Sequence, residues 1–174
     1  MSNHANTAGR LLIGAIALIH GALLEAQAPP PATGEVITRY LQQDIFIRPG
    51  VGFRSVQLGH SFVQVAQVWG EPVGMRRTGF FRSNRIWGYQ VGPNTEVLLS
   101  GPSRVTTIEV RGTMGSAFQS TEGARFGMTP HQIRSIYGRP DNSEGHRLTY
   151  SRRGVEFDFE SGVVRRIRVV QARR

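Results

Sequence analysis

Apolar residues recur at helical spacing in two short segments of this chain. The two sets are Val65, Val68 and Trp69, and Ile133, Ile136 and Tyr137. Spacings of three and four residues bring such side chains to one face of a helix. A hydroxyl residue suited to an N-cap, Ser61 or Thr129, precedes each segment, and a glycine, Gly70 or Gly138, follows it. The pattern predicts two short helices, each with one buried face.

The two segments are copies within one internal repeat. Residues 58–72 align without a gap with residues 126–140, at a constant offset of 68. The matching positions include the pairs Gly59/Gly127, Ser61/Thr129, Gly70/Gly138 and Pro72/Pro140. Because these residues cap, bury and end a helix, the repeat specifies a structural scaffold. Function is then expected where the two copies differ.

Alternating apolar and polar residues follow each predicted helix and indicate strands. The first copy has such stretches at 85–89, 95–99 and 105–110, and the second at 147–151, 155–160 and 163–170. Each unit is therefore expected to contain one helix and three strands. The predicted fold class is α+β, with two tandem helix-plus-three-strand repeats forming an antiparallel sheet and the helices packed on one side.

An uncharged apolar run precedes the repeats and predicts an export segment over residues 1–28. Its candidate membrane-anchoring residues are Leu11, Leu12, Ile13, Ile16, Leu18, Ile19, Leu23 and Leu24. A helix over 11–28 would be about 27 Å long, close to the hydrocarbon thickness of a bilayer. We expect a single N-terminal hydrophobic helix that anchors the chain in the inner membrane, with the folded part in the periplasm. The alternative is a signal peptide cleaved after Ala28, which would release the chain into the periplasm.

Four further segments follow the export segment in the predicted organisation. A Pro-rich spacer and a short helix occupy 29–50, repeat one 51–112, a linker 113–123 and repeat two 124–174. His20 lies inside the apolar run, where ligation of a pigment or haem is the minor alternative to an inert side chain.

Composition narrows the chemistry that this chain can perform. Its 174 residues contain no cysteine, which excludes disulfides, thiolate metal sites and the lipidated cysteine of a lipoprotein. The net charge is +9, and all 21 cationic side chains are arginine, which indicates either a coding bias or a surface selected for phosphate or carboxylate groups. Nucleic acid would fit this charge, but an exported chain is not expected to meet it. An anionic lipid remains an alternative partner.

No catalytic pattern is present in the sequence. The five histidines are scattered, and nucleophile elbows and phosphate or dinucleotide loops are missing. Glu156, Asp158 and Glu160 share one strand face, but Arg166 and Arg168 face them across the predicted hairpin and should pair with them. We therefore expect no enzyme activity, no metal, no cofactor and no small-molecule substrate.

The repeated pattern Gly-x-Ser/Thr, then Val/Ile-x-x-Val/Ile-Trp/Tyr-Gly-x-Pro, resembles two families over residues 51–170. One is the SmpA/OmlA lipoprotein domain of outer-membrane protein assembly, and the other is the β-lactamase inhibitor protein, which carries the unit in tandem. The resemblance implies a helix-plus-sheet fold and a binding role without catalysis. The chain departs from the first family in having two units and no cysteine, and from the second in lacking an acidic loop.

The loop 73–84 of repeat one is the predicted partner-binding surface, because arginine and aromatic residues are enriched at interface hot spots. The candidate residues are Arg76, Arg77, Phe80, Phe81, Arg82 and Arg85. The alternative is a solvated loop with Phe80 or Phe81 in the core. The expected function is a membrane-anchored periplasmic accessory subunit, without enzyme activity, that stabilises or assembles a larger membrane protein complex. A free periplasmic binding or inhibitor protein, or a basic protein that binds anionic lipid, is the alternative.

Overall fold

The computed structural model describes residues 44–79 and 83–173, all of which belong to the compact unit Pro31–Arg174. The predicted export segment with its anchoring residues, the helix expected before residue 44, and Phe80, Phe81 and Arg82 lie outside the described residues. Their predictions therefore remain as stated.

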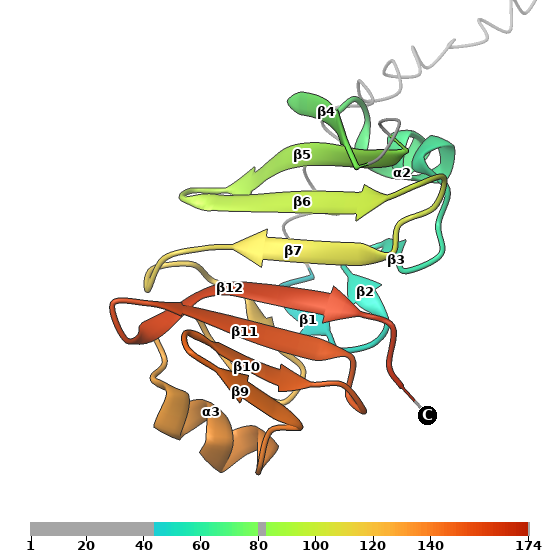
Figure 1. The fold of residues 1–174 in the computed structure, drawn as a ribbon. Helices are drawn as coiled ribbons and strands as arrows, with labels where there is room; N and C mark the ends of the chain where they lie inside the picture. The colour runs from blue at the N-terminus through green and yellow to red at the C-terminus, as the bar shows by residue number, and fades with distance from the viewer. Residues whose placement is uncertain (1–43, 80–82, 174) are drawn as a thin grey trace, which may run out of the picture. The chain divides into compact units, whose positions relative to one another are not determined.

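The larger of two sheets has eight strands in the order β4-β5-β6-β7-β12-β11-β10-β9, with antiparallel neighbours throughout. Its first four strands along the chain are β4 (Gly74–Thr78), β5 (Asn84–Gly92), β6 (Thr95–Gly101) and β7 (Thr107–Arg111). The other four are β9 (Asn142–Glu144), β10 (Arg147–Tyr150), β11 (Val155–Glu160) and β12 (Val163–Val170). Figure 1 shows β7 and β12 side by side at the centre of this sheet, although they are distant in sequence.

The smaller sheet has the order β3-β2-β1-β8 and joins the two halves of the described chain. It consists of β1 (Phe46–Arg48), β2 (Gly52–Phe53), β3 (Val56–Gln57) and β8 (Gln119–Ser120). β8 comes from the segment predicted as a linker and runs parallel to β1. The helices are α2 (Phe62–Trp69) and α3 (Pro130–Tyr137), each of eight residues.

The structure is mostly β, so the predicted α+β class is wrong. Each helix ends after two turns because Gly70 and Gly138 adopt φ angles of 74° and 80°, which favour glycine. The chain then adds four strands to the larger sheet after each helix instead of the three expected. β4 and β9 were not predicted, because every residue in them is exposed and the apolar alternation of a half-buried strand is missing.

Both helices begin where the sequence predicts. Ser61 and Thr129 are the N-caps, and each forms a capping box with a glutamine three residues later, Gln64 or Gln132. The predicted buried face is correct for Val65, Trp69, Ile133 and Tyr137, whereas Val68 is exposed and Ile136 only partly buried. Phe62, the first residue of α2, is buried instead.

The core lies on one face of the eight-stranded sheet. Two rows of buried side chains cross it in register: Tyr89, Val97, Val110, Ile167, Phe157 and Leu148, and Leu99, Ile108, Val169, Val155 and Tyr150. Trp69 of α2 packs on Tyr89 with ring centroids 5.1 Å apart, and Tyr137 of α3 packs on Tyr150 at the same distance. Both helices therefore cover this face and leave the opposite face of the sheet uncovered by them.

Candidate functional site

The uncovered side of the eight-stranded sheet, called here the polar face, carries rows of charged side chains. Arg147, Asp158, Arg166, Arg111 and Glu96 are successive neighbours on β10, β11, β12, β7 and β6. Side chains directly opposite on antiparallel strands are close enough to interact. The register therefore builds a continuous charged surface from residues that are far apart in the sequence.

Asp158 is the centre of this surface. It is only 1% exposed, and three guanidinium groups surround its carboxylate. Arg147 Nε donates to Oδ1 at 2.6 Å, while Arg168 Nη2 and Arg166 Nη1 lie 2.7 and 3.8 Å from Oδ2. The two contacts to Oδ2 lack hydrogen-bond geometry, so they act through charge. A buried anion among three cations fixes the geometry of β10, β11 and β12 on this face.

The acidic residues of β11 pair as the sequence predicts. Arg168 bonds Glu156 at 3.3 Å, and Arg166 pairs with both Asp158 and Glu160. These carboxylates are therefore already neutralised by arginines of the adjacent strand.

Glu109 on β7 links the two halves of the sheet. Arg111 Nε and Arg168 Nε donate to its two carboxylate oxygens at 2.5 and 2.7 Å. Burial by itself raises the pKa of Glu109, but the hydrogen bonds and positive charges of Arg168 and Arg111 outweigh burial and hold this pKa below its usual value of 4.5. Glu109 is thus an anion in the folded protein well into mildly acidic conditions.

The lowered pKa of Glu109 predicts a loss of stability in acid. In the unfolded chain Glu109 takes up a proton near pH 4.5, whereas in the folded protein it does so only at lower pH. Ionised Glu109 therefore adds its full share to the free energy of unfolding above pH 4.5, and this share decreases as the pH falls below 4.5. We expect the free energy of unfolding, measured with urea between about pH 3 and 6, to fall less steeply with acid in Glu109→Gln. Glu144→Gln, which removes an exposed carboxylate from β9, is the matched control and should retain the wild-type slope. Equal slopes in Glu109→Gln and wild type would contradict this assignment.

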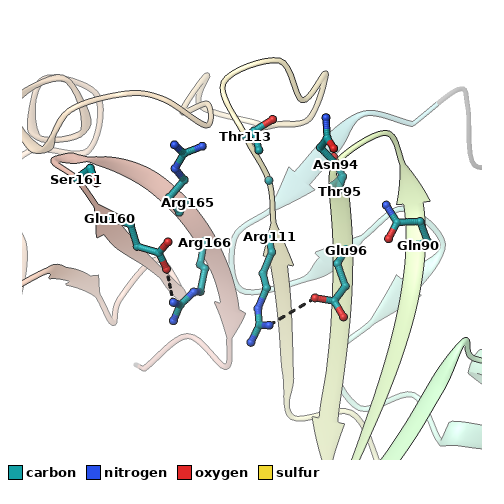
Figure 2. Close-up of a pocket in the computed structure, with 11 residues that line it drawn as sticks. Gln90, Asn94, Thr95, Glu96, Arg111, Thr113, Glu160, Ser161, Arg165 and Arg166 are labelled. Carbon is teal, nitrogen blue, oxygen red and sulfur yellow. Dashed lines mark hydrogen bonds and ion pairs between the residues drawn. The ribbon is translucent and has the colours of Figure 1, made fainter.

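A groove of about 680 Å³ opens at one end of the polar face, beside the β5–β6 and β11–β12 turns. Figure 2 shows Arg111, Arg165 and Arg166 along it, and we call it the arginine groove. Its carboxylates are Glu96, 3.4 Å from Arg111, and Glu160, which bonds Arg166. The groove thus holds three guanidinium groups and two carboxylates.

A β-bulge produces this concentration of arginine. Asp158 pairs with Arg166 and Phe159 pairs with Val164, so Arg165 is an extra residue on β12. Bulges redirect side chains in this way. Arg165 and Arg166 consequently both line the groove, and Figure 2 shows their guanidinium groups pointing in opposite directions. Arg165 forms no ion pair with a carboxylate of residues 44–79 or 83–173, so it can bind an incoming anionic group through its planar fork of donors.

A second groove of about 390 Å³ continues across the same face toward β4. Gly74, Gly88 and Leu98 line it, and it shares Glu96 and Arg111 with the arginine groove. The two depressions therefore meet at the Glu96–Arg111 ion pair, and the second adds the apolar side chains of Ile86 and Leu98 beside Arg76. That combination fits a protein partner better than a simple polyanion.

The structure divides the described part of the predicted partner-binding set between two faces. Arg76 pairs in register with Ile86 and lines the second groove. Arg77 is opposite Arg85, whose guanidinium lies over the Phe62 ring of α2 at 5.7 Å, on the other side of the sheet. Arg76, Arg77 and Arg85 therefore do not form one surface.

Arg111 and Arg165 are not among the site residues predicted from the sequence. Arg111 reaches the groove through the β7–β12 pairing, which joins the two halves of the sheet. Arg165 reaches it through the bulge. The sequence does contain one indication of the bulge, the adjacent pair Arg165 and Arg166 in a strand that otherwise alternates. Two successive side chains of a regular strand point to opposite faces, so such a pair interrupts the alternation.

The described residues contain neither a metal-binding cluster nor a membrane-spanning helix. Between residues 44 and 173, apart from 80–82, no group of three or more His, Asp or Glu side chains is placed to hold a metal ion. In the same part of the chain, neither helix is long and apolar enough to cross a membrane.

Comparison with known proteins gives distant similarities in structure alone. No protein-family model matches the chain, and a search of curated proteins finds no match. An extracellular protein containing an SCP domain, from Bacillus anthracis, aligns at 10% identity with a TM-score of 0.43. The alignment covers 66% of this chain but only 44% of that one. A candidate β-lactamase inhibitor protein from Streptococcus mutans aligns at 13% identity with a TM-score of 0.32, covering 78% of this chain and 96% of that one.

The Streptococcus mutans protein is a candidate β-lactamase inhibitor protein, and that is one of the two families that the repeat pattern resembles. The chain is thus similar at low identity to a candidate β-lactamase inhibitor protein, whereas the comparisons give no similarity to the SmpA/OmlA domain.

Proposed function

We propose that this chain is a non-enzymatic binding protein for another protein, which docks on the polar face of the eight-stranded sheet. The observation that carries the proposal is the pair of grooves that meet at the Glu96–Arg111 ion pair. One groove offers the guanidinium of Arg165, which pairs with no carboxylate of the described residues, and the other offers the apolar side chains of Ile86 and Leu98 beside Arg76. An acidic side chain of the partner would bind Arg165, with apolar residues beside it.

The rigidity of the polar face supports this role. Asp158 and Glu109 each bind two or more arginines, so the side chains around the grooves are held before a partner arrives. A preorganised surface loses less conformational entropy on binding and therefore binds more tightly.

Charge reversal in the groove tests the proposal. We expect Arg165→Glu to reduce recovery of the cross-linked native partner about tenfold, because an acidic group would meet a like charge. The recovery is measured by quantitative mass spectrometry after affinity purification at roughly 0.5 M NaCl, which screens non-specific attraction. Arg139→Glu makes the same change at an exposed arginine that follows α3 and should retain wild-type recovery. Equal recovery with Arg165→Glu and Arg139→Glu would refute docking at this groove.

The finer form of the proposal places the chain at the periplasmic side of the inner membrane as an accessory subunit of a membrane protein complex. The apolar run at 11–24 and the Pro-rich segment after it support this location. Mass spectrometry of the mature N-terminus, combined with membrane fractionation, tests the anchor. An intact apolar run in the membrane fraction is expected, and a chain that begins at Pro29 would make the protein a free periplasmic one.

A further inference from the structure

A further cavity of about 540 Å³ adjoins the arginine groove at Gln90 and Thr95, where the β5–β6 turn meets the segment that leads into β8. Much of its lining is apolar and comes from Ile45, Val91, Pro93, Ala117 and Phe118. Thr95 and Ser116 add two hydroxyl groups, whose oxygens lie 3.0 Å apart. Arg54 is the single charged residue among the described residues that line this cavity. The cavity therefore combines an apolar body with one cation.

Arg54 is held in an unusual position for an arginine. The residue is only 3% exposed, and its guanidinium lies 5.3 Å from the Phe53 ring centroid and 4.9 Å from that of Phe118. Its backbone has a φ of 53°, in the left-handed region that an arginine adopts at a cost. Aromatic contacts of this kind attract a cation but satisfy none of its hydrogen-bond donors.

The donors of Arg54 are incompletely used within the described part of the chain. Nε donates to the Asp44 carbonyl at 3.2 Å, and Nη2 makes a long contact of 3.4 Å to the Val91 carbonyl. Nη1 is buried and has no partner among the described residues. The Asp44 carboxylate instead accepts from the Phe46 amide and pairs with Arg48, 3.4 Å away. Arg54 thus has carbonyl partners but no bound carboxylate.

A buried cation with an unused donor requires an explanation, because desolvation of a charge costs several kcal/mol unless the charge is paired. Burial lowers the pKa of Arg54 to about 10, so the side chain is still a cation at neutral pH. A water molecule could accept from Nη1 but would add no negative charge, and the Asp44 carboxylate, which favours the Arg54 cation through charge, is already paired with Arg48. A bound anion would accept a hydrogen bond from the guanidinium and also neutralise its charge.

We propose that this cavity binds a small monocarboxylate with an apolar body, whose carboxylate accepts hydrogen bonds from the Arg54 guanidinium. The carboxylate replaces the long contact of Nη2 to the Val91 carbonyl, and a rotation of the guanidinium would bring the buried Nη1 to the second carboxylate oxygen in a bidentate pair. One buried cation neutralises one negative charge, whereas a phosphate dianion would leave a second charge buried. The apolar body packs against Ile45, Val91 and Phe118, beside the hydroxyls of Thr95 and Ser116, which bond each other.

Hexanoate and hexanol distinguish the proposed site from general apolar binding. In calorimetry with the full chain, hexanoate is expected to bind about tenfold more tightly than hexanol, since its carboxylate can form a charge-assisted hydrogen bond with Arg54 that the hydroxyl of hexanol cannot. Equal affinities, or no heat with hexanoate, would overturn the proposal and leave a water molecule as the partner of Nη1.

Two variants locate the binding. Arg54→Met keeps an unbranched apolar stem and should lose hexanoate affinity about tenfold without unfolding, because it removes the charge and leaves no unpaired ion behind. Arg165→Glu alters the arginine groove and should leave hexanoate affinity unchanged, so the result is independent of the proposed partner-binding face. Unchanged affinity in Arg54→Met, or equal losses in both variants, would refute the site. If Arg54→Met does not fold, nuclear Overhauser contacts between hexanoate and the Phe118 ring are measured in the wild type instead. Their absence would refute the site.

Discussion

Replacing Asp158 with asparagine should lower the free energy of unfolding by about 3 kcal/mol. The substitution preserves the size of the side chain and removes its charge, so three guanidinium groups within 3.8 Å lose their common anion. Removing one partner from a buried ion network costs more than the network itself contributes, because the remaining charges stay desolvated. The arginines are between 16% and 38% exposed, which keeps the expected loss at the lower end of the range for buried pairs. Urea denaturation at pH 7 measures the change.

Glu160→Gln is the matched control for Asp158→Asn. Glu160 lies on the same strand and pairs with the same Arg166, but its side chain is 52% exposed. Exposed ion pairs contribute about 0–1 kcal/mol, so this variant should be nearly as stable as the wild type. Equal losses of unfolding free energy in the two variants would show that the cost of removing a carboxylate from this face does not depend on how deeply it is buried.

Local features of the sequence predicted the parts of the fold that depend on neighbouring residues. A helix cap needs only a hydroxyl and a backbone amide a few residues later, and Ser61 and Thr129 both make that contact. The β11–β12 hairpin is local in the same sense. The two residues between the predicted stretches 155–160 and 163–170 are Ser161 and Gly162, which adopt φ angles of 52° and 77°, as a two-residue hairpin turn requires.

The fold class could not be predicted from the same local patterns. β4 and β9 form the two edges of the sheet, where no partner buries either face of the strand, so their sequences carry no alternation. Their pairing is decided by the backbone of β5 and β10. The smaller sheet has strands of two or three residues, too short for any period to be visible.

The candidate site depends on strand register, which the sequence alone does not display. The prediction of a partner surface in the loop 73–84 used residues that are adjacent in the chain, and strand pairing then separated Arg76 from Arg77 and Arg85. Arg111 and Arg166 are instead brought opposite each other by the β7–β12 pairing. Buried Arg54 was also missed, because arginine is normally assigned to the surface and only the packing of Phe53 and Phe118 reveals otherwise.

Replacing Phe157 with alanine should lower the free energy of unfolding by about 3–5 kcal/mol, the range for a fully buried phenylalanine. Phe157 is 0% exposed and packs on Tyr137 and Tyr150 with ring centroids 5.0 and 6.1 Å away, so it connects α3 to the sheet. Because its neighbours are held by strand pairing, they cannot close the cavity that alanine would leave. Phe46→Ala is the matched control, since Phe46 is 41% exposed and should cost about 1 kcal/mol or less. A loss in Phe157→Ala no larger than in Phe46→Ala, measured by urea denaturation, would mean that α3 is not held to the sheet by this aromatic cluster.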